Sequence, residues 1–400
     1  MKFKPFKAVL PAADKVHLVA SRSYVSYSKE DLIDKLKGNP YTFLHVIHPD
    51  VDGDYRGRRI AYFEEVRKNY EKFLSEEIFS LEGKASFFIY RQDTPEYSFQ
   101  GLLGAVSVED YEQGKIKIHE HTISQREGRF TDYLDTTGIN AEPVLLMSKE
   151  ETCSNLMERV CKEQPLYCFS TTDRVKHTVW QMSNAEDIQE VEAEMSRVSE
   201  LYIADGHHRS ASSVALKQRK SEEGNNDEVY HYFMALVLSQ AQLKILGFHR
   251  LVKCVVEFDL NLFLSDLKKM GNLQEVNEQE LQLAEGKIGV YTAGKWYAFQ
   301  FEKTDSHFID AEWLSKNILH PIFGIEDERT DKRISHADGL VPSHQIAKMV
   351  DEGKADFAFL LHPISTQTLM RISDEGLTMP PKSTYILPKL RSGLVIYPMR

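Results

Sequence analysis

The stretch Leu201–Ser213, which reads LYIADGHHRSASS, constrains the fold more than any other part of the sequence. Leu201–Ala204 is an apolar run that is long enough for a buried strand. Asp205-Gly206 is a turn dipeptide, because glycine tolerates backbone angles that other residues avoid. The composition of Ser210–Arg219 favours a helix with one apolar face. We therefore predict a strand, a tight turn and a helix.

The predicted bend brings together a carboxylate, a glycine, two imidazoles and a guanidinium: Asp205, Gly206, His207, His208 and Arg209. A helix N-terminus has N–H groups without partners and a partial positive charge, so it attracts anions. Arg209 adds donors that match phosphate oxygens, and Ser210 adds a hydroxyl. This pattern predicts a phosphate site. The structural alternative makes Asp205 a helix cap and the histidines surface residues, but the combined motif favours function.

Composition narrows the classes of protein to which the chain can belong. Four hundred residues predict two or three domains, and 42% hydrophobic with 27% charged residues is ordinary for a soluble protein. A net charge of −11 argues against broad binding to nucleic acid, and no apolar stretch reaches the length of a membrane span. The four cysteines form no CxxC pair, so we expect a reduced, cytoplasmic protein.

Local patterns predict the elements of residues 1–250. Ser28 caps a helix that runs through Lys37, and a second helix covers Ile60–Glu77. Strands are predicted over Tyr41–Ile47 and in an antiparallel meander: Ser86–Arg91, Tyr97–Val108 and Lys115–His119. Further elements are helices over 150–164 and Asp187–Val198 and strands over His177–Gln181 and Tyr230–Leu238.

The local sequence pattern changes near residue 250. We therefore predict two parts of the chain, 1–250 and 251–400. The second part has predicted helices over Phe258–Met270, Asn277–Leu283 and Asp310–Leu319, the last ending before Pro321. A hairpin joins Lys287–Tyr291 to Lys295–Phe301, and Gly393–Tyr397 forms a final strand.

A second motif is KIKIHEHT, residues 115–122. Continued as a strand, it places Glu120 and Thr122 on one face and His119 and His121 on the other. A carboxylate flanked by imidazoles at a strand end can act as a general base or a metal ligand. The structural alternative is a polar strand end that leaves the sheet.

The histidines and the carboxylate of these two motifs could hold one of two metal ions. Zinc could use the imidazoles of His119, His121, His207 and His208, but no cysteine accompanies them, and fifteen histidines make chance clusters common. Magnesium held by a phosphate and by Asp205 is the more natural choice.

A third motif is MPPKSTYILPKLRSGLVI, residues 379–396. Its three prolines stiffen a loop that carries polar residues able to contact a phosphate or a carboxylate: Lys382, Ser383, Thr384, Lys389 and Arg391. The structural alternative is a rigid surface turn whose lysines are only solvated.

These motifs carry a resemblance to known families. DGHHR resembles the phosphate-binding turn of the ParB/sulfiredoxin superfamily, and most of all the DGHHR turn of the ADP-dependent free serine kinases. The chain also resembles a large prokaryotic family of uncharacterised proteins. That resemblance runs from KPFKAVLPA through NPYTFLHVIHPD, KIKIHEHT and YIADGHHRSASS to MPPKSTYILPKLRSGLVI.

The resemblance implies an α/β or mixed α+β fold with a ParB/sulfiredoxin-like nucleotide-binding core and additional α+β parts at both ends. It implies a phosphotransferase that uses ATP or ADP with magnesium and acts on free serine or a related hydroxylated metabolite. In this mechanism Glu120 receives the acceptor proton, Asp205 holds magnesium, and Gly206–Ser210 hold the phosphates. The implied contacts to substrate are His119, His121, Thr122, Arg129, Lys382, Ser383 and Lys389.

The chain departs from the family pattern in two places. The PPYD-like turn near the N-terminus is replaced by Ala20–Tyr24, and Gly128-Arg129 stands where a DR pair usually follows the HExT stretch. Altered specificity or lost activity is therefore open. Two other functions also stay open: a ParB-like nucleotide switch that hydrolyses its ligand, and a metal-dependent hydrolase built on the histidines.

Overall fold

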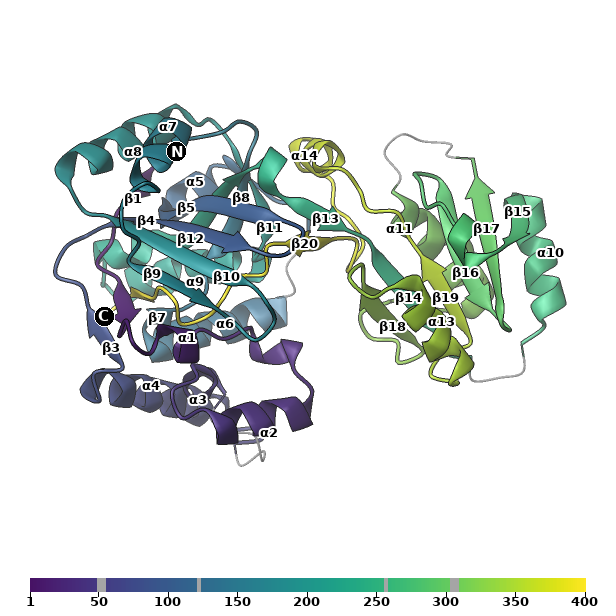
Figure 1. Ribbon diagram of the computed structural model, residues 1–400, viewed down its shortest axis with the longest axis horizontal. Helices are drawn as coiled ribbons and strands as arrows, with labels where there is room; N and C mark the ends of the chain where they lie inside the picture. The colour runs from purple at the N-terminus through teal and green to yellow at the C-terminus, as the bar shows by residue number, and fades with distance from the viewer. Residues whose placement is uncertain (49–54, 121–123, 255–257, 303–308) are drawn as a thin grey trace. The chain divides into compact units, whose positions relative to one another are not determined.

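A computed structural model describes residues 1–48, 55–120, 124–254, 258–302 and 309–400 of the chain (Figure 1). The fold is mixed α+β, as the sequence predicts, and it consists of two compact units. Unit 1 comprises Met1–Leu243 together with Pro388–Arg400, and unit 2 comprises Lys244–Leu387. The sequence-based division at residue 250 therefore differs from the structural one, chiefly because the last segment of the chain returns to unit 1. No described helix has the length and apolar character needed to span a membrane.

Unit 1 is built on a mixed sheet with the order β6-β11-β8-β12-β5-β4-β10-β9, in which β1 also pairs with β5. Two neighbouring pairs, β6 with β11 and β8 with β12, are parallel, and the other pairs are antiparallel. The strands are β1 Phe3–Lys4, β4 Phe87–Asp93, β5 Ser98–Ser107, β6 Ile116–Lys117, β8 Val144–Ser148, β9 Tyr167–Ser170, β10 Lys176–Met182, β11 Leu201–Asp205 and β12 Tyr232–Ser239. Two small ribbons pair β2 Val9–Pro11 with β3 Phe79–Leu81 and β7 Ile139–Asn140 with β21 Tyr397–Pro398.

The helices of unit 1 pack into two cores. They are α1 Val16–Val19, α2 Lys29–Gly38, α3 Leu44–Ile47, α4 Arg59–Ser75, α5 Val108–Glu112, α6 Ser124–Thr137, α7 Ser154–Val160, α8 Ala185–Arg197 and α9 His207–Glu222, with 3-10 turns η1 Tyr24–Ser26, η2 Glu228–His231 and η3 Gln240–Gln242. Leu156 of α7 and Val191 of α8 are buried with Ile203 of the sheet, and the two helices lie together over one of its faces (Figure 1). A second core joins Val46 of α3 and Val66 of α4.

Unit 2 has a sheet of the order β15-β17-β16-β19-β14-β18, in which every neighbouring pair is antiparallel. Its strands are β14 Phe248–Val252, β15 Gly271–Val276, β16 Lys287–Thr292, β17 Lys295–Phe301, β18 Ile334–Asp338 and β19 Phe357–Leu360, and a ribbon pairs β13 Lys244–Leu246 with β20 Tyr385–Leu387. Its helical segments are α10 Leu260–Met270, η4 Glu278–Glu280, α11 Asp310–Leu314, the π-helical η5 Ser315–Leu319, α12 His320–Phe323, α13 Ser343–Asp351 and α14 Thr366–Asp374.

The elements with strong local patterns form as predicted. The strand, turn and helix around Gly206 are β11 and α9. The Ser28 side chain caps α2 by accepting a hydrogen bond from the Asp31 N–H. The hairpin of β16 and β17 also forms. In each case the turn or cap residues and the spacing of the hydrophobic residues predict the same element.

Several predictions were wrong. The helix predicted over Asn277–Leu283 is only the 3-10 turn η4, and the final strand predicted over Gly393–Tyr397 is β21, which begins at Tyr397. The segment predicted as a strand over Tyr41–Ile47 contains α3, because both of its faces are buried and the Thr42 hydroxyl accepts from the Leu44 N–H. The meander ends after two strands, since α5 carries the chain away and β6 pairs with β11 instead. The helix predicted to end before Pro321 continues to Phe323, and the π-helical turn η5 precedes the proline, whose missing N–H cannot join the regular ladder.

Candidate functional site

Gly206 makes the turn between β11 and α9 possible. Its φ of 111° lies in the region that favours glycine, and an added Cβ would lie 3.3 Å from both Arg209 Nε and Val144 Cγ1. No side chain caps the helix at Gly206. Because α9 begins at His207, its first N–H groups have no acceptor within the helix, and they form an anion-attracting end of a 16-residue helix.

Charged side chains surround this helix end. Asp205 Oδ2 lies 3.0 Å from Lys389 Nζ, and its other carboxylate oxygen lies 3.7 Å from Arg209 Nη2. Arg209 also pairs with Glu142 at 3.1 Å. Burial would raise the pKa of Asp205, but the charges of Lys389 and Arg209 outweigh it and lower this pKa to about 2. Asp205 is therefore a carboxylate near neutral pH.

Glu120 reaches the same turn from β6. Because β6 pairs in parallel with β11, the residues that follow both strands lie at the same edge of the sheet. Glu120 Oε2 lies 4.0 Å from His207 Nδ1, and 45% of the glutamate side chain is exposed. The structure thus brings Glu120 to the DGHHR turn, although 87 residues separate the two side chains in the sequence.

The two histidines beneath Glu120 are buried and uncharged near neutral pH. The His119 side chain is buried, with 3% of the residue exposed. The backbone N–H of His119 donates to His207 Nε2 over 3.4 Å, and the two imidazole rings meet edge to face. Burial lowers the pKa of His207 to about 4, and burial together with His207 lowers that of His119 well below its usual value. Since Nε2 accepts, the proton of neutral His207 is on Nδ1 and faces Glu120.

α6 supplies a wall beside the second histidine of the motif. The rings of His208 and Phe130 stack with centroids 6.4 Å apart, and burial lowers the pKa of His208. The Nδ1 atom of His208 is buried and makes no hydrogen bond in the described structure. Arg129 is an exposed residue of α6.

The main chain around Lys389 is fixed by contacts that sequence reasoning missed. The Gln92 side chain donates to the Lys389 carbonyl over 3.2 Å. Arg391, 7% exposed, donates to Asp173 over 2.6 Å, and Arg22 binds the same carboxylate oxygen. These contacts place the Lys389 side chain against the turn. No motif marks Asp173 or Gln92, so the sequence held nothing that could have found them.

Not every predicted site residue is placed at the turn. Lys382 and Ser383 belong to unit 2, where the Lys382 ammonium lies over the Phe248 ring and the Ser383 hydroxyl donates to the Pro380 carbonyl. His121 and Thr122 fall outside the described residues.

Of the metal ligands expected from the sequence, all but His121 are among the described residues. Among the residues described, no group of three or more His, Cys, Asp or Glu side chains could hold a metal ion. Asp205 is one carboxylate, and Mg²⁺ commonly binds one or two carboxylates together with phosphates and water. Asp205 therefore fits magnesium only in the company of phosphate oxygens.

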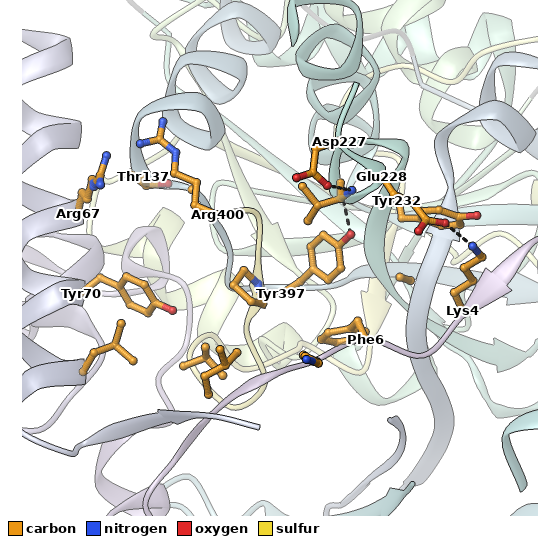
Figure 2. Close-up of a pocket in the computed structure, with 18 of the residues that line it drawn as sticks. Lys4, Phe6, Arg67, Tyr70, Thr137, Asp227, Glu228, Tyr232, Tyr397 and Arg400 are labelled. Atoms are coloured by element: carbon orange, nitrogen blue, oxygen red, sulfur yellow. Dashed lines mark hydrogen bonds and ion pairs between the residues drawn. The ribbon is translucent and has the colours of Figure 1, made fainter. Parts of the chain in front are cut away.

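Unit 1 also has a cavity of about 650 Å³ that none of the residues of the turn lines (Figure 2). It is formed by the segment around Phe6, by α4, by η2 and by the end of the chain. Its N-terminal wall belongs to the KPFKAVLPA stretch, in which the sequence analysis predicts no site.

Comparison with known proteins places the chain as follows. The family described as "Protein of unknown function (DUF1015)" matches residues 3–324. No curated protein matches the sequence. Similar solved structures include a free serine kinase variant in complex with ADP, with 16% identity over 74% of this chain and 94% of that one and a TM-score of 0.38. C-terminally truncated SbnI from Staphylococcus aureus has 14% identity over 74% and 87%, with a TM-score of 0.41. A conserved hypothetical protein from Pyrococcus furiosus has 14% identity over 72% and 91%, with a TM-score of 0.36.

Proposed function

We propose that this chain, which belongs to the DUF1015 family, binds ATP or ADP at Asp205–Ser210 and transfers a phosphoryl group to a small hydroxylated metabolite such as free serine. One observation carries the proposal. The open N-terminal end of α9, the cations Arg209 and Lys389, and the carboxylate of Glu120 converge from three distant parts of the chain. Phosphoryl transfer needs positioning and charge neutralisation above all, and this set supplies both.

The first part of the mechanism is phosphate binding. The free N–H groups at the start of α9 donate to phosphate oxygens, and Gly206 leaves room for their close approach. Arg209 is held by Glu142 and lies near Asp205, so its guanidinium is already oriented. The Lys389 ammonium is bound to Asp205 over a fixed main chain, and 41% of the side chain is exposed. An incoming phosphate can therefore compete with Asp205 for Lys389.

The second part is proton removal. The acceptor hydroxyl oxygen forms a bond to phosphorus, the bond from phosphorus to the bridging oxygen breaks, and its electron pair leaves with the nucleotide. Glu120 takes the hydroxyl proton as general base. His207 orients Glu120 through its Nδ1–H side, and His119 fixes the ring of His207 by donating to Nε2. We therefore assign His119 a positioning role rather than a contact with substrate.

Magnesium is part of the proposal through Asp205. Once Lys389 pairs with the phosphates, the Asp205 carboxylate would be available to hold a magnesium ion. Such an ion would supply positive charge to offset that of the phosphates. Among the acceptor contacts expected from the sequence, His121, Thr122 and Arg129 follow Glu120 closely in the chain and stay candidates.

The deciding experiment follows a labelled terminal phosphoryl group of ATP or ADP in the presence of serine and other hydroxylated metabolites. We expect the label on the metabolite. Glu120→Gln should lower the transfer rate by about 10²–10⁴-fold, the usual effect of losing a general base, while nucleotide affinity stays the same. Glu186→Gln, at an exposed position of α8, is the matched control and should change neither. Label found only in free phosphate would contradict a kinase and favour the nucleotide switch.

A further inference from the structure

The cavity of Figure 2 has walls that suit an apolar molecule. Phe6 and Val9 come from the N-terminal segment, Leu74 and Leu81 from α4 and β3, and Pro398 from the last strand. A volume of about 650 Å³ lies within the range of small-molecule sites, which are mostly apolar with a few polar groups that fix orientation.

Tyr70 provides one such polar group. It is 7% exposed, and its hydroxyl points into the cavity in Figure 2. None of the described residues forms a hydrogen bond with this hydroxyl, and its oxygen is accessible from the cavity rather than fully buried. Tyr397 shows the contrast across the same cavity, since its hydroxyl donates to the Val229 carbonyl over 2.9 Å. Burial raises the pKa of Tyr70, so its hydroxyl keeps its proton and offers a donor.

The charged residues around the cavity favour a ligand that carries a negatively charged hydrogen-bond acceptor. Four cations line it, Lys4, Lys7, Arg67 and Arg400, against three carboxylates, Glu71, Asp227 and Glu228, in a chain whose net charge is −11. Glu228 is bound by Lys4, Glu71 pairs with Arg67, and the Asp227 carboxylate accepts from the Val229 N–H. Lys7 is exposed and makes no ion pair among the described residues. The carboxylates are thus engaged, while a cation at the rim is available.

We propose that this cavity is a second small-molecule site of unit 1 and that it binds an amphipathic carboxylate. The apolar body of the ligand lies against Phe6, Val9 and Leu74, and its carboxylate accepts from the Tyr70 hydroxyl. Lys7 adds long-range attraction. The site does not depend on nucleotide binding at the DGHHR turn, because the two share no residue.

The test is calorimetric titration of the full chain with octanoate, octanol and octylamine, which share an apolar body and differ in the head group. We expect octanoate to bind at least about tenfold more tightly than the other two, a difference within reach of one hydrogen bond to a charged group. Octanol binding as tightly as octanoate would overturn the proposal, as would the absence of binding by octanoate.

Two variants locate the site. Tyr70→Phe removes only the hydroxyl and should weaken octanoate binding by about tenfold. Leu81→Glu places a carboxylate on the wall at a position that is 59% exposed, so the fold should persist while octanoate binding is lost. Leu262→Glu, at a position of unit 2 that is 57% exposed, is the matched control and should leave octanoate binding unchanged. Octanoate binding that survives both unit 1 substitutions would overturn the assignment to this cavity.

Discussion

The two units each contain an arginine–carboxylate cluster, and the clusters differ in how completely their hydrogen bonds are satisfied. In unit 2 the Arg250 side chain is fully buried, binds Glu328 at 3.1 Å, and donates to the carbonyls of Phe248, Pro381 and Lys382. Further donors from Ser315 and His336 reach Glu328. The charges of this buried pair are therefore satisfied by partners within unit 2.

The cluster at the DGHHR turn of unit 1 is open by comparison. The Asp205 side chain is 41% exposed. One of its carboxylate oxygens lies 3.7 Å from Arg209 Nη2, and the other forms an ion pair with Lys389. The helix end beside it still offers N–H groups. Buried charge in itself therefore does not mark a functional site. A functional site is better marked by charged groups that are incompletely paired and lie beside unused hydrogen-bond donors. A ligand can replace one partner of such a group at a small cost in free energy.

Breaking the closed cluster should have the largest effect. Arg250→Met leaves the Glu328 charge buried without its main partner, which should lower the free energy of unfolding by about 3–5 kcal/mol. Denaturant unfolding measures the loss. The double variant Arg250→Met/Glu328→Leu removes both charges and should recover most of it. A loss under about 1 kcal/mol for the single variant would show that the closed cluster is as replaceable as a surface pair.

The buried histidine of the open site should make stability depend on pH. The pKa of His207 is about 4 in the folded chain against the ordinary histidine value of 6.5, so the unfolded chain binds more protons between these values. Stability from this group is full above pH 6.5 and is lost as the pH falls through 4, by about 3 kcal/mol in all.

Unfolding free energies at several pH values test this, because His207→Gln should flatten the loss relative to the unsubstituted chain. His249 of unit 2 is the matched comparison, since burial lowers its pKa to about 4 as well, and the Leu361 N–H donates to its Nδ1. Equal pH slopes for His207→Gln and the unsubstituted chain would mean that His207 takes up its proton without cost.

The parts of the site that sequence reasoning found are those with local patterns. The apolar strand, Gly206 and the helix of the DGHHR turn follow one another in the chain, so the pattern and the structure coincide. Glu120 was singled out because it ends a strand between histidines. Its place beside His207 depends on the parallel pairing of β6 with β11, whereas the local patterns predict β6 as part of an antiparallel meander.

The parts that sequence reasoning could not find are held by contacts between distant residues. Asp173 binds Arg391 across 218 positions, and Gln92 binds the Lys389 carbonyl across 297. No periodicity or turn pattern encodes such pairs. The same limit explains α3, where burial on both faces overrode an alternating pattern.

Removing the guanidinium from the open cluster should weaken the ligand more than the fold. Arg209→Ala should reduce nucleotide affinity by about 1.5–3 kcal/mol, the range for a hydrogen bond to a charged group. Calorimetric titration with ATP and ADP measures the change. Arg159→Ala removes an arginine that also pairs with carboxylates, at α7, and should leave nucleotide affinity unchanged. Identical affinities of Arg209→Ala and the unsubstituted chain would exclude the turn as the phosphate site.

The smallest effect, and the sharpest test of partner exchange, is expected at Lys389. Its ion pair with Asp205 joins two half-exposed side chains, so Lys389→Met should change the free energy of unfolding by no more than about 1 kcal/mol. If Lys389 moves to the phosphates, the same variant should weaken nucleotide binding by about tenfold. If Lys389 only competes with magnesium for Asp205, nucleotide affinity should stay the same or rise. Titrations with and without magnesium separate these outcomes, and Lys382→Met, a lysine of unit 2 whose ammonium lies over an aromatic ring, is the control. A rise in affinity would contradict the exchange and leave Lys389 as a lock on the empty turn.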